Sequence, residues 1–176
     1  MQILGVPGSL RKKSYSTALL NSLSDIAGNG IEFHIAAPLD RLPYFNPDVE
    51  KETIPEEVRI WKKEIELADA VIFFTPEYVH NISGVLKNAI EWLVSSHEIV
   101  GKPVTVIAAS PNHLGAIQAF TSLSHIMDVI SGNLLKSASC NFSSINKKFD
   151  ESGKLADPEI IKILKNSLDE IQKSIK

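Results

Sequence analysis

The stretch that decides the fold reads AVIFFTPEYVHNISG and covers residues 70–84. It opens on a continuous apolar run, Val71 to Phe74, which is typical of a strand buried on both faces, as in a parallel sheet. A polar segment, residues 75–83, follows at once and offers backbone amides, a flat aromatic side chain and few charges. In parallel sheets, ligands bind beyond the carboxyl ends of the strands. We therefore expect a buried central strand that ends in a binding loop.

Outward from this stretch, short apolar runs alternate with longer amphipathic segments. The apolar runs predict strands, and the amphipathic segments predict helices by their spacing. The alternation predicts an α/β fold in one domain, residues 1–176, with a five-stranded parallel sheet and helices on both faces. The expected strands are Ile3–Pro7, Ile31–Ala36, Ala70–Phe74, Pro103–Ala109 and Leu134–Cys140. The expected helices are Ser16–Ile26, Pro55–Leu67, Gly84–Val94, Ala116–Ile130 and Pro158–Ile175.

One of the connecting segments is unusually long. Residues 38–55 are polar and rich in proline, and long loops in compact domains are often functional. Thr53 is the expected N-cap of the helix that follows, with Pro55 in its first turn. A ligand is expected at the loops that leave the first, third and fourth strands, which are Gly8–Ser16, Thr75–Ser83 and Ser110–Gly115.

Composition excludes several classes of protein. The net charge is −3, from 18 Lys and Arg against 21 Asp and Glu, and no basic block supports nucleic-acid binding. Cys140 is the only cysteine, which excludes an intrachain disulfide and fits a reducing, cytoplasmic compartment. The histidines do not cluster with carboxylates at metal-ligand spacing, so we expect no metal. The longest apolar runs are far shorter than the roughly 20 residues that span a bilayer, so we expect no membrane contact.

The first loop has the chemistry of an anion site. Hydroxyl groups gather where a helix begins, and the free N–H groups of a helix N-terminus favour phosphate. Gly8 permits a tight turn, and Arg11 adds a forked, charged donor. The alternative, left equally open by spacing alone, is that Ser14 or Ser16 only caps the helix and Arg11 is solvated. The candidate residues are Ser9, Arg11, Ser14, Ser16 and Thr17.

The second and third loops suit a planar ring with polar edges. For the side chain of Glu77 we expect a solvated loop carboxylate, and Tyr78 could equally be a packing residue. In the third loop, Gly and Asn favour turns that aim amides at a ligand, and a simple connecting turn is the alternative. The candidate residues are Pro76, Glu77, Tyr78, Val79, Ser110, Asn112 and Gly115.

Two motifs give the chain a resemblance to a known family. The first loop follows the pattern G-S-x-R-x-x-S-x-N, with Ser16 in place of Asn. Residues 76–92 follow P-E-Y-N-x-S-x-P-G-x-L-K-N-A-I-D-W at most positions. The chain thus resembles the NADPH-dependent FMN reductases, a flavodoxin-like group that includes chromate, quinone and azo-dye reductases. Further matches are Leu42–Asp48, Phe149–Asp150 and Asp157–Glu159.

The resemblance implies a flavodoxin-like three-layer sandwich with strand order 2-1-3-4-5 that binds FMN. It implies that Ser9, Arg11, Ser16 and Thr17 hold the FMN phosphate. Residues 76–78 would contact the ring, chiefly through backbone groups, and residues 110–115 would close its other side. Val79, Asn81 and Ser83 replace the usual Asn, Ser and Pro, and we expect them to remove polar side-chain contacts near the ring.

The resemblance also implies an activity. The flavin would take a hydride from NADPH or NADH and pass electrons, in a ping-pong reaction, to a small acceptor such as a flavin, quinone, azo compound or metal oxyanion. The chemistry belongs to the flavin, so no catalytic side chain is expected. Members of the family are usually homodimers or homotetramers. The alternative in another class is a non-enzymatic, flavodoxin-like electron carrier.

Overall fold

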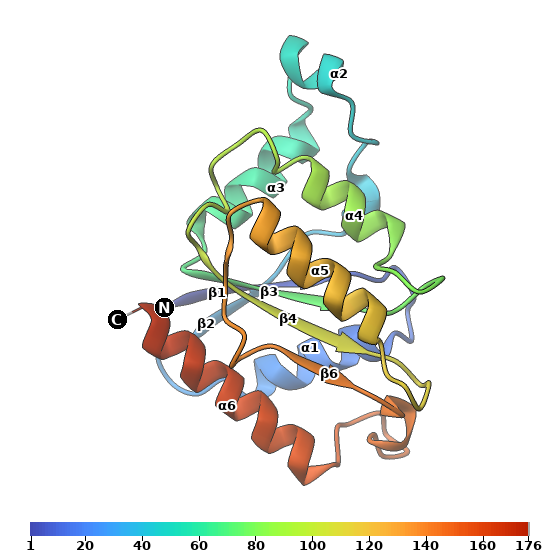
Figure 1. Cartoon of the computed structure of the whole chain (residues 1–176). Coiled ribbons are helices and arrows are strands. Elements are labelled where there is room, and N and C mark those ends of the chain that lie inside the picture. The colour runs from blue at the N-terminus through green and yellow to red at the C-terminus, as the bar shows by residue number, and fades with distance from the viewer. Residues whose placement is uncertain (176) are drawn as a thin grey trace.

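The computed structural model describes residues 1–175 and shows a parallel sheet between two layers of helices (Figure 1). The sheet order is β2-β1-β3-β4-β5, with β6 also paired to β4, and all of these pairings are parallel. The expected flavodoxin-like fold and its strand order are thereby confirmed. The strands are β1 (Gln2–Pro7), β2 (Glu32–Ile35), β3 (Ala70–Thr75), β4 (Pro103–Ala109), β5 (Asn133–Leu134) and β6 (Cys140–Phe142).

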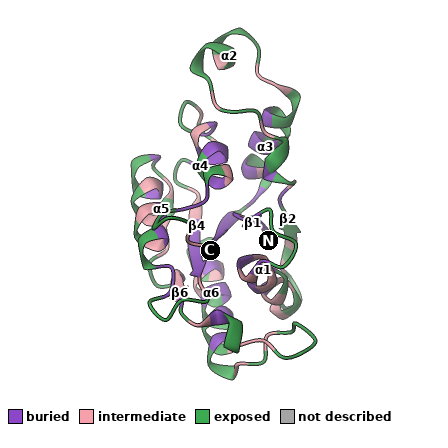
Figure 2. Cartoon of the chain, turned by 90° about the vertical axis from the view of Figure 1, so that its right-hand side faces the viewer, coloured by how far each residue is buried: buried purple, intermediate pink, exposed green. Residues whose placement is uncertain are grey.

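Burial on both faces of β3 explains its continuous apolar sequence. Phe73 packs among residues of α3, α4 and α5, whereas Phe74 packs among residues of α1 and α6, and both are fully buried. Figure 2 shows buried residues along the sheet and on the inward faces of the helices. The helices of the two layers are α3 (Glu56–Leu67), α4 (Gly84–Glu91) and α5 (Ile117–Val129) on one face, and α1 (Tyr15–Ile26) and α6 (Pro158–Ile175) on the other.

The fifth strand departs from expectation. The sequence predicts one strand over residues 134–140, whereas the chain forms β5 and β6 with a turn between them. The Ser139 amide donates to the Leu135 carbonyl (3.0 Å), which closes this turn. The Ser139 hydroxyl accepts the Val106 amide of β4 (3.0 Å) and so replaces the missing strand partner. A side chain thus makes the interruption tolerable, because the β4 amide remains hydrogen-bonded.

The long loop, residues 38–55, contains two short helices, η1 (Leu39–Arg41) and α2 (Pro47–Glu52). A third short helix, η2 (Ile145–Lys147), precedes α6. Asn46 caps α2 by accepting the Asp48 amide at 2.9 Å. Figures 1 and 2 both show α2 projecting from the body of the molecule. The segment is therefore an ordered arm rather than an irregular loop.

The expected cap of α3 is wrong. Thr53 ends α2 instead, with its amide donating to the Val49 carbonyl at 3.0 Å. Pro55 occupies the N-cap position of α3 and supplies no side-chain hydrogen bond. Thr53 is the C-cap of α2, so it cannot also be the N-cap of α3, which begins at Glu56. Among the other boundaries, α4 ends at Glu91, earlier than the expected Val94.

Candidate functional site

The candidate loops leave three neighbouring strands of the sheet. β1 and β4 flank β3, so the β1–α1, β3–α4 and β4–α5 loops emerge side by side at the carboxyl edge. Gly8 holds the first loop against β3, because its amide donates to the Phe74 carbonyl at 2.7 Å. A Cβ at this position would lie 2.7 Å from the same carbonyl oxygen, so only glycine permits this approach.

The hydroxyl groups of the first loop gather at the beginning of α1. Ser14 is its N-cap and accepts the Thr17 amide at 3.4 Å, which confirms the capping interpretation for this residue. Its oxygen also lies 2.8 Å from the Ser16 hydroxyl oxygen, and both serines are buried. The Thr17 hydroxyl is buried without a hydrogen-bond partner in the described part of the chain. A buried hydroxyl without a partner is costly, so a group that hydrogen-bonds to it would stabilise this part of the fold.

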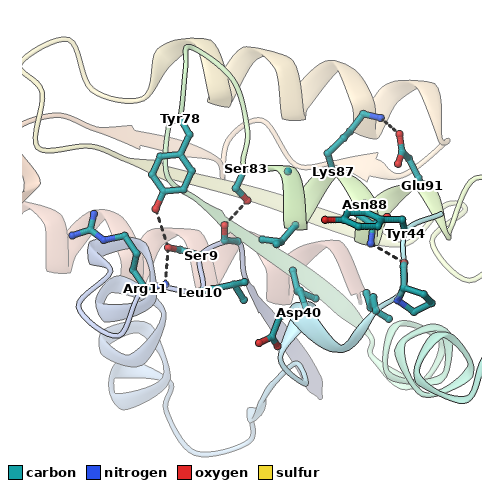
Figure 3. A pocket seen from close by; sticks show the side chains of 16 residues that line it. Ser9, Leu10, Arg11, Asp40, Tyr44, Tyr78, Ser83, Lys87, Asn88 and Glu91 are labelled. Atoms are coloured by element: carbon teal, nitrogen blue, oxygen red, sulfur yellow. Dashed lines mark hydrogen bonds and ion pairs between the residues drawn. The ribbon is translucent and has the colours of Figure 1, made fainter.

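A cavity of about 860 Å³ adjoins this loop (Figure 3). Ser9 and Tyr78 lie together in its wall, where their hydroxyl groups are hydrogen-bonded at 3.1 Å, and the Arg11 amide donates to the Ser9 hydroxyl at 3.4 Å. The Arg11 side chain is exposed, and within residues 1–175 it forms no ion pair. The loop before α2 and the exposed side of α4 complete the wall, with Asp40, Tyr44 and Lys87 among the lining residues.

These last three lining residues were not among the candidates. Two of them, Asp40 and Tyr44, lie in the long loop that was expected to be functional. Tyr44 also lies in the stretch Leu42–Asp48 that matches the family. Lys87 lies in the tract 76–92 that matches the family motif, but nothing in the sequence places it on the cavity side of α4. The place of Lys87 in the cavity wall is evident only from the fold, in which α4 contacts η1, an element distant in the sequence.

The second loop forms a tight turn. The Tyr78 amide donates to the Asn81 carbonyl (2.9 Å), and the Asn81 amide donates back to the Tyr78 carbonyl (3.0 Å). Between them, Val79 and His80 have φ values of 51° and 55°. Two successive left-handed residues define a type I′ turn, which normally carries Asn and Gly. Val79, at the tip of this turn, is 98% exposed.

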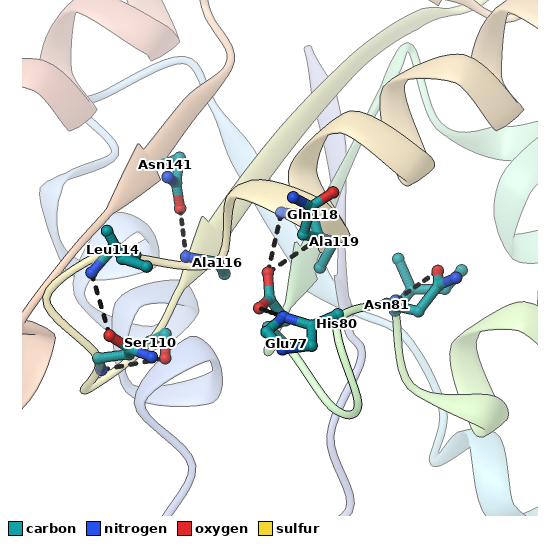
Figure 4. A network of polar contacts seen from close by, with 11 residues as sticks. Glu77, His80, Asn81, Ser110, Leu114, Ala116, Gln118, Ala119 and Asn141 are labelled. Carbon is teal, nitrogen blue, oxygen red and sulfur yellow. Dashed lines mark hydrogen bonds and ion pairs between the residues drawn. The ribbon is translucent and has the colours of Figure 1, made fainter.

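Glu77 is not the solvated carboxylate that the sequence predicts. Its Oε2 accepts the amides of Gln118 (2.9 Å) and Ala119 (3.2 Å) in the first turn of α5, as Figure 4 shows. Its Oε1 lies 3.2 Å from Nδ1 of His80. The Glu77 side chain is only 12% exposed. The partner amides lie some forty residues away in sequence, so no local pattern signals this contact.

Asn81 and Ser83 make polar contacts within the protein, whereas the expectation for them concerned contacts near the ring. Asn81 Oδ1 accepts the hydroxyl of Ser122 on α5 at 2.9 Å. Ser83 caps α4 by accepting the Leu86 amide (3.3 Å), and its hydroxyl donates to the Gly8 carbonyl of the first loop (2.5 Å). Both side chains therefore hold the loop to its neighbours.

The third loop is built by its own polar side chains. Ser110 Oγ accepts the Asn112 amide, and Asn112 Oδ1 accepts the Leu114 amide, both at 3.1 Å. Gly115 has φ 72°, and a Cβ there would lie 2.7 Å from the Asn141 side chain. The side chains of Ser110 and Asn112 thus accept amides of their own loop, as in the connecting-turn alternative.

The structure divides the candidates into groups. Ser9, Arg11 and Tyr78 line the cavity of about 860 Å³, whereas Ser14 and Thr17 line a neighbouring one of about 540 Å³. The remaining candidates line neither of these two cavities; they are Ser16, Pro76, Glu77, Val79, Ser110, Asn112 and Gly115. Over residues 1–175, no three His, Cys, Asp or Glu side chains gather as metal ligands. No helix in that range has the length and apolar character needed to cross a membrane.

A doubly wound parallel sheet, with a hydroxyl-rich helix N-terminus and two further loops at its carboxyl edge, defines a flavodoxin-like α/β protein. Comparison with known proteins narrows this class. The model of the NADPH-dependent FMN reductases matches residues 1–147, and the chain belongs to that family. It is therefore an NAD(P)H-dependent flavin oxidoreductase with FMN as its cofactor.

Individual relatives agree with this assignment. An NAD(P)H-dependent FMN reductase of Pseudomonas aeruginosa is 31% identical over 98% of this chain and 94% of its own. A quinone reductase of Pseudomonas putida is 34% identical over 86% of this chain and 83% of its own. The solved structure of FerB, an NAD(P)H:(acceptor) oxidoreductase of Paracoccus denitrificans, superposes with a TM-score of 0.84 at 28% identity, covering 98% of this chain and 97% of FerB.

Proposed function

We propose that this single-domain chain, residues 1–176, holds FMN across its three loops and transfers electrons from NAD(P)H to a quinone. The FMN phosphate lies at the β1–α1 loop, on Ser9, Arg11, Ser14, Ser16 and Thr17. The flavin ring lies between the β3–α4 loop, at Pro76, Glu77, Tyr78 and Val79, and the β4–α5 loop, at Ser110, Asn112 and Gly115.

The beginning of α1 carries the proposal, because its residues fit a phosphate group. The Thr17 hydroxyl has no partner within residues 1–175 and can donate to a phosphate oxygen. Ser14 and Ser16 share one hydrogen bond, so whichever hydroxyl accepts it keeps its own proton to donate. The dipole of α1 and the unpaired Arg11 add positive charge.

When bound, FMN supplies the redox chemistry, accepting a hydride from NAD(P)H and delivering electrons to the acceptor. The chain supplies placement. Gly115 lets the third loop turn tightly enough for its backbone to face the ring. The type I′ turn places the backbone of the second loop toward the ring in the same way. Neither role needs a side chain that exchanges protons.

Support for a quinone as acceptor comes from two sources. Several relatives are named quinone reductases, and the cavity of about 860 Å³ has a largely apolar wall suited to a flat, weakly polar molecule. The apolar wall is formed by Leu10, Leu39, Leu42, Pro43 and Tyr44.

We further propose that the chain acts as a homodimer or homotetramer in the cytoplasm. The arm that carries α2 leaves Tyr44 91% exposed and Val49 40% exposed, which suits contact with a second copy. Light scattering on the purified protein tests this assembly, and a monomer at micromolar concentration would contradict it.

A steady-state assay tests the activity. We expect the FMN-loaded protein to oxidise NADPH or NADH when 1,4-benzoquinone is present, with parallel lines in a double-reciprocal plot. If neither nicotinamide is oxidised although FMN is bound, the reductase proposal fails and the electron-carrier alternative is favoured. The two donors, compared at equal concentration, establish which one the enzyme prefers.

Replacing Arg11 by Ala tests the phosphate end of the site. We expect FMN affinity to fall about tenfold, because one charge-assisted hydrogen bond to the phosphate is lost. Quenching of flavin fluorescence measures the Kd. The control is Lys165→Ala, which removes an exposed positive charge from α6. Equal FMN affinity in the wild-type and Arg11→Ala proteins would remove Arg11 from the site.

A further inference from the structure

Glu77 connects the two loops between which we place the flavin ring. It belongs to the β3–α4 loop, and it binds the amides of Gln118 and Ala119, just after the β4–α5 loop ends. β3 and β4 are adjacent, with Thr75 paired to Ala108, so the two loops begin from the same line of the sheet. The carboxylate therefore spans the gap between them (Figure 4).

α5 depends on this contact at its beginning. Its N-cap residue, Ala116, has no side-chain hydrogen bond to offer. The first-turn amides of a helix lack partners within the helix, and a carboxylate is the most favourable group to accept them. Glu77 supplies that carboxylate from another loop. With only 12% of the side chain exposed, these amides replace water as hydrogen-bond donors to the carboxylate.

Other contacts make the connection rigid. Asn81 binds Ser122 one turn further along α5, so the second loop is attached to the helix at both ends of its tight turn. On the other side, Asn141 Oδ1 accepts the Ala116 amide at 2.8 Å and holds the end of the third loop to β6. Moving the Glu77 carboxylate would therefore shift the second loop relative to the third.

We propose that Glu77 is a positioning residue that sets the separation of the two loops and thereby the width of the slot for the flavin ring. The inference rests on the proposed placement of FMN. It concerns the side chain of Glu77, whereas the family resemblance implies contacts to the ring through backbone groups. A residue that only stabilised α5 would affect unfolding and leave flavin affinity unchanged at temperatures where the protein is folded.

The test compares Glu77→Ala, which removes the connection, with Glu77→Gln, which keeps an oxygen that can accept both amides. We expect Glu77→Ala to weaken the binding of FMN and of riboflavin by the same factor, about tenfold, because only the ring end is affected. Arg11→Ala, in contrast, should weaken FMN and leave riboflavin unchanged. Glu77→Gln should stay within about threefold of the wild type for both flavins.

A second measurement needs no flavin. In the FMN-free protein, hydrogen exchange at the amides of Gln118 and Ala119 should quicken in Glu77→Ala and remain slow in Glu77→Gln. The matched control is Asp157→Ala, because Asp157 likewise accepts two first-turn amides, those of Glu159 and Ile160 of α6. It should lower thermal stability and leave both flavin affinities unchanged.

The outcomes separate the possible failures. Unchanged flavin affinities in Glu77→Ala, together with faster amide exchange, would make Glu77 a helix cap alone and overturn the inference. Equal losses in Glu77→Ala and Glu77→Gln would overturn it too. A wild-type protein that binds no FMN would instead refute the proposed function. If Glu77→Ala does not fold, Glu77→Asp replaces it: its shorter side chain reaches the amides only when the loop moves, so both flavins should again bind more weakly.

Discussion

At the scale of a single residue, Val79 adopts a left-handed backbone conformation that its side chain disfavours. A β-branched side chain at a φ of 51° is strained, whereas Asn and Gly adopt this conformation readily. The sequence gives no hint of a turn here, because Val-His carries none of the usual turn signals. The hydrogen bonds of Tyr78 and Asn81, and the attachment of Glu77 and Asn81 to α5, impose the conformation.

Replacing Val79 by Asn should therefore stabilise the FMN-free protein by about 1 kcal/mol. The strain is relieved, and no packing is lost because the valine side chain is 98% exposed. Urea unfolding measures the change. Val100→Asn is the control, since Val100 is also exposed and has an ordinary negative φ. A variant no more stable than the wild type would show that the turn stores no strain at this residue.

At the scale of elements, α2 is attached to the body by a mostly buried ion pair. Glu50 Oε1 lies 2.9 Å from Lys62 Nζ on α3 and accepts the Ser95 hydroxyl at 2.5 Å, and the charged side chains are 14% and 10% exposed. Burial raises the pKa of Glu50, but the hydrogen bonds from Ser95 and Lys62 and the charge of Lys62 outweigh it and hold that pKa below the ordinary value of a glutamate. The ionised carboxylate of Glu50 thus attaches α2 to both α3 and Ser95.

Glu50→Gln should lower the free energy of unfolding by about 2 kcal/mol at pH 7, because charged hydrogen bonds are lost from a largely buried pair. The folded-state pKa lies below the unfolded one. The stabilisation is therefore fully present above the unfolded-state pKa and is lost as pH falls through the folded-state pKa. Urea unfolding of both proteins at several pH values should show their difference shrinking in acid. Glu52→Gln, an exposed change on the same arm, should show no such convergence.

At the scale of the whole molecule, the sheet separates two hydrophobic layers. The layer of α3, α4 and α5 and the layer of α1 and α6 form two separate clusters of buried residues, and the side chains of the strands alternate between them. The order of elements along the chain could be predicted from sequence, because apolar periodicity indicates each strand and helix. The order of the strands in the sheet followed from the family resemblance. The Glu77 contact and the split at Ser139 could not be predicted, because each depends on backbone groups brought close only by the completed fold.

Substitutions in the two layers should act independently. Ile65→Val on α3 and Ile171→Val on α6 each remove one methyl from a fully buried side chain and should cost about 1 kcal/mol. The double variant should lose the sum of the two, within about 0.5 kcal/mol. Denaturant unfolding of all four proteins checks this. A clear departure from the sum would mean that the layers are coupled through the sheet.

The division of the last strand into β5 and β6 has a consequence for the protein's behaviour in concentrated solution. A long, regular edge strand offers a row of free amides and carbonyls to which another chain can add and start an aggregate. Here the edge beyond β4 consists of two short strands interrupted by a turn, and the Ser139 hydroxyl already occupies the amide of Val106. The opposite edge, β2, carries the charged Glu32 and the polar His34 among its few residues. Both edges of the sheet therefore oppose the addition of a further strand and protect the protein against self-association through its sheet.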